Sequence, residues 1–544
     1  MKENQQITGK VVDIFEQKIY GATIFIKGNY IHSIEKHEDA KGPYILPGLI
    51  DSHIHIESSM ITPRYFAQEA VKHGTTGTVS DPHEIANVLG EKGIQAMIDD
   101  AEQTPFKFFF GVPSCVPATP FETSGAVLDS KIVQKLIARK QFYYLAEMMN
   151  FPGVINQDPE VMNKIKHAHD NKKPVDGHVP GLTGTDLEKY IAAGITTDHE
   201  CGNYEEAVEK IKKGMKIQLR EGSAAKDFDN LYKLIDEYPD QVMLCSDDKH
   251  PDDLIEGHIN QLMKKGIEKG LNLFNLLKAA VVNPAQHYNL PVGMLRINDP
   301  ADFILVDNLD DFIVSQTYIG GEKVFDQDGS HLSVMPAEFP NIMEAQKLEI
   351  SDLEVENKNK PVKVINAEDR TLYTTFESIN LNSNDDKLYS DTNHDILKIV
   401  VQNRYKKQKP SIGFIKNFGL QKVAIATSVA HDSHNIICVG VDDESIVSAV
   451  NEIINIGGGN VVYDGNTLTS LPLEFGGLMT SKPASDVAGQ YQKLNSITKH
   501  LGCSLYAPFM TLAFMALPVI PELKITDQGL FDVTQFKYTA LYDE

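Results

Sequence analysis

The chain has 544 residues, which at about 150 residues per domain predicts two to four domains. Acidic residues outnumber basic ones by 75 to 51, and the net charge of −24 argues against long-range attraction to nucleic acid or to an anionic membrane. Hydrophobic residues make up 42% and charged residues 23% of the chain, an ordinary globular composition that excludes wholesale disorder.

Cysteine usage and the N-terminus bear on the cellular compartment. The five cysteines are scattered and form no CxxC pair, so the sequence predicts neither a disulfide framework nor a thiolate zinc site. The polar N-terminus lacks the apolar core of a signal peptide. The chain also has no uninterrupted apolar run of about 18 residues, so the sequence predicts no membrane span. We therefore expect a soluble, cytoplasmic protein.

The predicted elements begin with a small β unit. Residues 11–14 and 22–26 are apolar runs separated by polar and glycine-bearing turns, as expected for short strands. Strand patterning returns within 292–306 and at 318–324. We therefore predict one discontinuous β domain made of residues 1–46 and 291–345.

Between these two parts, residues 47–290 alternate short apolar runs with stretches of helical spacing. Eight strand-like runs, each followed by a helical pattern, are typical of an α/β fold of the (β/α)8 barrel type. The runs are residues 49–56, 76–80, 106–112, 142–147, 174–178, 195–199, 216–219 and 242–246. A doubly wound open sheet is the alternative, but its Gly-rich phosphate-binding turn is missing after the first run.

The last part of the chain changes character again. Residues 346–362 are polar and are predicted to form a linker or an exposed edge. Residues 362–544 are predicted to form a C-terminal α+β domain, with strands at 398–401, 424–427 and 436–439.

Side chains of the kinds that bind metals end several of the predicted barrel strands. His53 and His55 close the first strand, and because strand positions two apart face the same side, their rings point together. Later strand ends supply Glu147, His178, His199 and Asp247. The carboxyl ends of barrel strands meet at one rim, so this set predicts a site for zinc, manganese or iron, with a hydrogen-bonded network as the alternative.

The segments around these residues resemble the motif series of bacterial adenine deaminases in the amidohydrolase superfamily. The matching barrel segments are PGLIDSHIHIESSMITP, SDPHEIANVLG, LAEMMNFPGV, DGHVPGLTG, TDHE and CSDDKHPDDL. The C-terminal segments are IGFIKNFGL, SVAHDSHNIICVG, GLMTSKP and PFMTLAFMALPVIPELKITDQGLFDV. The resemblance covers about residues 44 to 537.

The resemblance implies a binuclear divalent metal centre, with manganese or iron(II) as the cofactor. His53 and His55 would hold one metal, completed by Asp247. His178 and His199 would hold the other. Glu147 would bridge the two in place of the carboxylated lysine of many superfamily members, which argues against dihydroorotase-like and hydantoinase-like relatives.

The implied activity is hydrolytic deamination of adenine to hypoxanthine and ammonia, in purine salvage. A metal-activated hydroxide would attack C6 of adenine, with Asp247 as the proton shuttle. Glu200 is predicted to help protonate a ring nitrogen, with pairing to a neighbouring cation as the alternative. A homo-oligomer is implied, and neither nucleic acid nor membrane is expected as a partner.

Three further residues are predicted to contact the substrate. His83 and Glu84 follow the second strand at the same rim; the alternatives are an additional metal position or an acidic helix N-terminus. Arg220 ends the seventh strand and is predicted to hold the purine or to pair with site carboxylates, with a structural ion pair as the alternative.

The C-terminal segment contains His431 and His434. We expect this pair to be solvated or hydrogen-bonded in a loop, unless the domain caps the barrel mouth and shapes the purine pocket. Two other functions stay open from the sequence. One is an amidohydrolase acting on a different aminated heterocycle or cyclic amide, and the other is a catalytically inactive metal-binding sensor.

Overall fold

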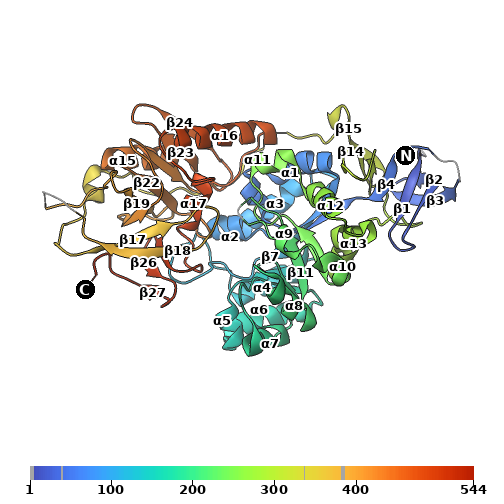
Figure 1. The fold of residues 1–544 in the computed structure, drawn as a ribbon, viewed down its shortest axis with the longest axis horizontal. Coiled ribbons are helices and arrows are strands. Elements are labelled where there is room, and N and C mark those ends of the chain that lie inside the picture. The colour runs from blue at the N-terminus through green and yellow to red at the C-terminus, as the bar shows by residue number, and fades with distance from the viewer. Residues whose placement is uncertain (1–4, 38–40, 224, 336, 382–385, 544) are drawn as a thin grey trace.

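The structure, a computed structural model, describes residues 5–37, 41–223, 225–335, 337–381 and 386–543. A barrel lies in the middle of the molecule, between a β domain at the N-terminal end and an α+β domain at the C-terminal end (Figure 1). Within these described ranges, no helix is long and apolar enough to cross a membrane.

The N-terminal β domain is one eight-stranded sheet, built from both sides of the barrel sequence. Its strands, in spatial order, are β16 (Gly329–Ser330), β15 (Glu322–Asp326), β14 (Val314–Ile319), β13 (Phe303–Val306), β4 (Tyr44–Pro47), β1 (Gln5–Asp13), β2 (Lys18–Lys27) and β3 (Tyr30–Lys36). The antiparallel pairing of β13 with β4 joins the two halves. Ile24, Ile45 and Phe303 are buried in the core of this sheet.

The barrel consists of two parallel sheets that follow one another in chain order. The first contains β5 (Leu49–Ile54), β6 (Thr75–Ser80), β7 (Lys107–Val112), β8 (Phe142–Met148) and β9 (Val175–Gly177). The second contains β10 (Thr197–Asp198), β11 (Lys216–Arg220) and β12 (Val242–Cys245). Single parallel bridges, Ile54 to Asp247 and Val175 to Ile195, join their edges, so the predicted barrel is confirmed but only partly closed.

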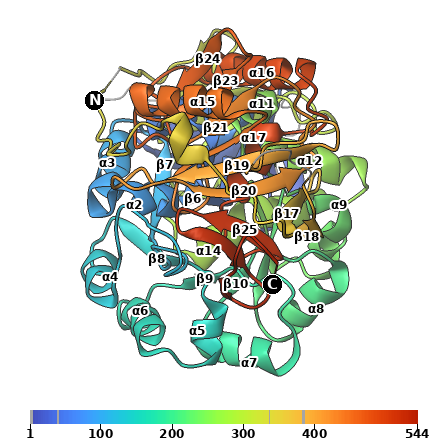
Figure 2. The ribbon, with the colours of Figure 1, turned by 90° about the vertical axis from the view of Figure 1, so that its left-hand side faces the viewer.

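Local sequence explains the alternation of strands and helices. All six residues of β5 and of β6 are buried, as expected for parallel strands covered on both faces. The helix α6 (Pro159–Asp170) begins with the side chain of Asp158 accepting hydrogen bonds from the Glu160 and Val161 amides, and with proline at its first position. Helices such as α4 (Ser130–Ile137), α7 (Gly184–Ala192) and α8 (Tyr204–Lys212) surround the strands (Figure 2).

The C-terminal domain is built on a second eight-stranded sheet. Its strands, in spatial order, are β18 (Thr374–Ile379), β17 (Val362–Ala367), β20 (Ser411–Lys416), β19 (Ile396–Gln402), β22 (Ile436–Gly440), β21 (Ala424–Thr427), β23 (Gly459–Tyr463) and β24 (Leu468–Pro472). The sheet packs with α15 (Asp443–Ile456), α16 (Ala484–His500) and α17 (Pro508–Phe514). A small sheet of β25 (Leu523–Thr526), β26 (Gly529–Asp532) and β27 (Lys537–Tyr538) follows.

The prediction that residues 346–362 form a linker or exposed edge is partly wrong. This stretch contains the short helix η4 (Ile350–Leu353), closed by a capping box between Glu349 and Asp352. Leu348 and Leu353 are buried in the same apolar cluster as residues of α15. These two leucines pack the otherwise polar segment against the domain.

The C-terminal domain covers the barrel end at which the strands terminate (Figure 2). Ile61, just after β5, forms a parallel bridge with Thr480. The loop after β7 is held by Thr123, whose amide and hydroxyl both donate to Asp527 at 2.8 and 2.6 Å. Asn435 donates to the Thr123 carbonyl at 2.9 Å, so the domain is tied to the rim by several polar contacts.

Candidate metal centre and active site

The two histidines at the end of β5 face one another at the barrel rim. The Nε2 atoms of His53 and His55 are 3.2 Å apart, and both side chains are buried. His53 stacks on His199, the residue after β10, with ring centroids 4.1 Å apart. The predicted convergence of imidazoles therefore involves strands from both barrel sheets.

Glu147, near the end of β8, lies between two groups of histidines. Its Oε1 atom is 3.3 Å from Nε2 of His55. Its Oε2 atom is 2.7 Å from Nδ1 of His178 and 3.3 Å from Nε2 of His199. One carboxylate oxygen thus serves each side, which is the geometry required of a bridging ligand.

Asp247, just after β12, closes the site from the other edge of the barrel. Its Oδ1 atom is 3.5 Å from His53 Nε2 and 3.3 Å from His55 Nε2. Its amide donates to the His53 carbonyl at 2.9 Å, and its carbonyl accepts from the His55 amide at 3.3 Å. Backbone pairing across the seam between the two sheets therefore positions this carboxylate.

These six side chains fit a divalent metal centre. The ligand atoms of His53, His55 and Asp247 lie within 4.8 Å of one another, as do those of His53, Glu147 and His199. The Nδ1 atoms of His53 and His199 are buried without a hydrogen-bond partner among the described residues. Imidazole and carboxylate donors suit zinc, manganese and iron alike.

Electrostatics at the rim favour a cation. Burial raises the pKa of Glu147, but the charge and hydrogen bond of His178 outweigh burial and hold it well below its usual range. Burial lowers the pKa of His199, but Glu147 and Asp247 raise it to about 9. The carboxylates thus stabilise positive charge at this point, whether it is a proton or a metal ion.

Arg220 and Glu200 pair with each other beside the predicted ligands. Arg220, at the end of β11, donates to Glu200 Oε2 at 2.9 Å, to Asp247 Oδ2 at 2.9 Å and to Asp227 Oδ2 at 2.7 Å. Arg220 and the charges of His178 and His199 lower the pKa of Glu200 although burial raises it. For Glu200 these contacts are those of the ion-pair alternative, and for Arg220 they match the predicted pairing with site carboxylates. Both residues line the site cavity.

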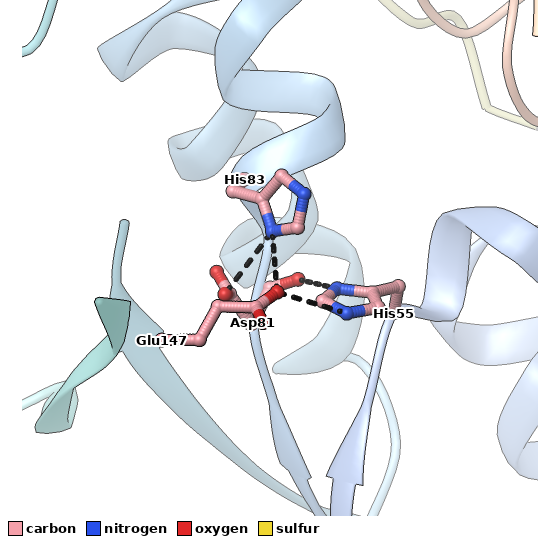
Figure 3. Close-up of side chains that lie close together, drawn as sticks. All are labelled: His55, Asp81, His83 and Glu147. Atoms are coloured by element: carbon pink, nitrogen blue, oxygen red, sulfur yellow. Dashed lines mark hydrogen bonds and ion pairs between the residues drawn. The ribbon is translucent and has the colours of Figure 1, made fainter. Parts of the chain in front are cut away.

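His83 lies at the start of α2 (His83–Leu89), directly above the strand ends (Figure 3). Its Nδ1 atom is 3.1 Å from Asp81 Oδ2 and 3.5 Å from Glu147 Oε1. His55 Nδ1 is 3.1 Å from the Asp81 carbonyl. Asp81, which sequence reasoning did not select, therefore supports both histidines, and its place at the end of β6 was the available signal.

Glu84 connects the barrel to the C-terminal domain. Its Oε1 atom is 2.5 Å from Nδ1 of His431, and its Oε2 atom bonds Nε2 of His434. All three side chains are buried, so the two C-terminal histidines are at the site rather than in solvent. The amide of Ala430 donates to His434 Nδ1 at 3.1 Å, so Nε2 of that ring carries the proton given to Glu84.

A cavity lies between the rim and the C-terminal domain. The barrel side contains the predicted ligands other than His53, together with His83, Glu84, Glu200 and Arg220. The C-terminal side is formed by Leu372, His431, Asp432, Phe514, Leu517, Val519 and Ile520. Sequence reasoning predicted no separate role for Asp432 or for the apolar members, because no local pattern indicates that they face a barrel formed by a distant part of the chain.

Comparison with known proteins shows similarity over nearly the whole chain. Residues 44–324 match the amidohydrolase family, and residues 371–537 match the adenine deaminase C-terminal domain. The adenine deaminase of Methanosarcina barkeri is 52% identical over 547 aligned residues, covering 99% of each chain. Those of Salinibacter ruber and Borreliella burgdorferi are 46% and 48% identical, with at least 98% of each chain covered.

Proposed function

The chain belongs to the adenine deaminase family of amidohydrolases, and from this we propose that it hydrolyses adenine to hypoxanthine and ammonia. The observation that carries the proposal is the convergence of four histidines and two carboxylates, from both barrel sheets, at the barrel rim, where all but His53 line one cavity closed by the C-terminal domain. Both parts of this arrangement lie within regions that match the family.

We assign the metal ligands in two groups. His53, His55 and Asp247 would hold one divalent cation, and His178 and His199 the other, with Glu147 between them. We propose manganese or iron(II) as the ions at both positions. When bound, such cations lower the pKa of a water molecule to about 7 and so supply a nucleophile at neutral pH.

The protein's own side chains would bind, orient and move protons. Asp247 uses Oδ2 to accept from Arg220, which leaves Oδ1 on the side of the histidines. In that position Oδ1 is the proposed acceptor of the proton released by the attacking water and its donor to the leaving amino group. Arg220 then holds the carboxylate in one orientation throughout the reaction.

Glu200 has a more restricted place in this proposal. Because Arg220 holds it ionised, the contacts support the ion-pair alternative, and a role in protonating a ring nitrogen stays a prediction. The same holds for direct substrate contacts of His83, Glu84 and Arg220. Purine salvage, a cytoplasmic location, a homo-oligomeric state and the absence of nucleic-acid or membrane partners also stay predictions.

The test is anaerobic reconstitution of the metal-free protein with manganese or iron(II), followed by assays of adenine loss, hypoxanthine formation and ammonia release. The expected result is one ammonia and one hypoxanthine for each adenine consumed. Bound metal without turnover of adenine would contradict the proposal and direct the search to other aminated heterocycles, to cyclic amides or to a sensor function.

A further inference from the structure

The C-terminal wall of the site cavity contains two adjacent polar residues, His431 and Asp432, among apolar neighbours. Both side chains are buried, with 5% and 4% exposure, and both line the cavity. They lie in the loop between β21 and β22, and nothing in the catalytic proposal uses them.

Asp432 is a buried carboxylate with one oxygen that no hydrogen-bond donor in the described part of the chain reaches. Its Oδ2 atom has no hydrogen-bond donor among the residues that the structure describes, although the positive charges of His83 and His431 lower the pKa of Asp432. A buried carboxylate oxygen without a hydrogen-bond donor costs folding free energy, so a ligand that supplies the donor would stabilise it. Because burial and the charge of Glu84 raise its pKa only to about 6, the group is largely ionised at neutral pH and can only accept hydrogen bonds.

His431 offers the opposite chemistry beside it. Its Nδ1 atom is held by Glu84 at 2.5 Å, and its ring stacks on Phe514 with centroids 4.6 Å apart. Burial lowers its pKa, but Glu84 raises it to about 9, so Nε2 also carries a proton at neutral pH. Within the described part of the chain, no residue accepts that proton, which leaves Nε2 as a fixed donor.

A donor beside an acceptor matches the five-membered ring of an unsubstituted purine. In free adenine one nitrogen of this ring carries a hydrogen and the other does not. We propose that Asp432 accepts the ring N–H and His431 donates to the bare ring nitrogen, so that this pair recognises the free base and rejects purines substituted there. The inference rests on the proposed deaminase function and adds the residues that determine its specificity.

Glu84 and Phe514 would orient this pair. Glu84 and the stacked Phe514 hold the plane of the His431 ring, while His434 occupies the second oxygen of Glu84. Arg404, which is fully buried, donates to the His434 carbonyl at 3.3 Å and to the Ile342 carbonyl at 2.7 Å. The loop is thus preorganised by the domain behind it, as a recognition element requires.

The experiment compares adenine with 7-methyladenine and 9-methyladenine as substrates of the metal-loaded enzyme. Asp432→Asn and Asp432→Ala are expected to raise the KM for adenine about 10- to 100-fold, more for alanine, with a smaller change in kcat. They are also expected to shrink the preference for adenine over both methylated bases, because neither methylated base has a ring N–H for Asp432 to accept. Retention of the wild-type KM and preference in both variants would overturn the proposal.

Two substitutions of His431 separate its two nitrogens. His431→Asn keeps a polar group near Nδ1 but removes the Nε2 donor, so the KM for adenine should rise about 10-fold or more. His431→Gln places an amide N–H near the Nε2 position and should restore part of that loss. A smaller KM effect for asparagine than for glutamine would contradict the assignment of Nε2 as the donor.

Glu122→Gln is the matched control. Glu122 is buried, and its pKa is raised well above the usual range by burial and by the charge of Asp432. Glutamine therefore resembles its protonated form, and Glu122 does not line the cavity. The control should keep wild-type KM, preference and metal content.

Metal content and unfolding temperature are measured for every variant, because loss of metal in the Asp432 variants would make Asp432 a ligand and overturn the recognition role. The wild-type assay separates the proposed function from the proposed recognition pair. Absence of adenine turnover in the wild type would refute the proposed function, whereas turnover with unaltered Asp432 variants would refute the recognition pair alone.

Discussion

The two sides of the cavity are built by different principles. On the barrel side, the six predicted ligands come from the ends of five parallel strands, and backbone pairing fixes carboxylates such as Asp247. On the other side, a loop and the chain around α17 present mostly apolar side chains with one donor and one acceptor. Rigid strand ends suit chemistry that needs exact ligand placement, and loops on a second domain suit recognition of a particular base.

Glu84 joins these two sides, because its backbone belongs to a barrel helix and its carboxylate bonds His431 and His434 of the C-terminal domain. If the barrel side holds the metal and the C-terminal side recognises the base, substitutions on the barrel side should remove metal or turnover. Substitutions on the C-terminal side should change KM and selectivity while the metal stays bound.

The largest effect is expected for Glu147→Ala. Because one oxygen of Glu147 faces His55 and the other faces His178 and His199, its loss should release most of the metal and reduce kcat/KM about 10⁴-fold or more. Metal analysis together with the ammonia assay checks this. Glu188→Ala, whose side chain is 60% exposed, is the control, and full metal retention in Glu147→Ala would contradict the bridging role.

Asp247→Asn should reduce kcat about 10²- to 10⁴-fold with a smaller effect on KM, because an amide cannot carry the proton. Steady-state kinetics on protein of verified metal content tests this. Asp229→Asn, at a side chain 65% exposed, is the control. Near-normal turnover in Asp247→Asn would exclude the shuttle.

Glu84→Gln tests the connection between the two sides. The glutamine side chain has only one acceptor oxygen, so its NH₂ group would face an N–H of the His431 or His434 ring. The orientation of His431 should then be lost, and the KM for adenine should rise about 10- to 100-fold. Metal content should stay at the wild-type level. Loss of one metal equivalent would instead make Glu84, His431 and His434 a cation site, and the C-terminal side would then also hold metal.

The smallest effect on activity and a clear effect on stability are expected for Lys210→Met. Lys210 is fully buried beneath the rim and bonds Asp198 at 2.8 Å and the Val179 carbonyl at 2.7 Å, next to the ligands His199 and His178. Removing one partner of a buried pair costs about 3–5 kcal/mol of unfolding free energy, measured by denaturant titration. Lys166→Met, an exposed i,i+4 pair partner, should cost about 1 kcal/mol or less.

This last effect has a defined pH dependence. Burial raises the pKa of Asp198, but Lys210 outweighs burial and lowers it below the unfolded value of about 3.9. A lowered carboxyl pKa contributes stability that is complete above the unfolded pKa and is lost as the pH falls through the folded pKa. The difference between wild type and Lys210→Met should therefore be largest near pH 7 and shrink below about pH 4; a constant difference would contradict the pair as its source.

The sequence predicted the strand ends better than the contacts between domains. His53 and His55 were found because strand periodicity is local, and the remaining ligand-type residues because they end parallel strands. The segment from His431 to His434 was seen to contain metal-type residues, but its place at the site was left open, and no separate role was predicted for Asp432. The buried leucines of residues 346–362 were likewise missed, because hydrophobic packing depends on which surface a short segment meets.

By itself, the sequence determined the family, the alternation of strands and helices in the barrel, and which side chains end the barrel strands. Those features follow from local periodicity and from motifs around each strand end. Only the tertiary structure decided that Arg220 holds Glu200 and that Glu84 reaches His431 and His434. Those partners are set by how a separate domain packs onto the rim, and residues about 350 positions apart meet there because burying both surfaces is favourable, which no local pattern records.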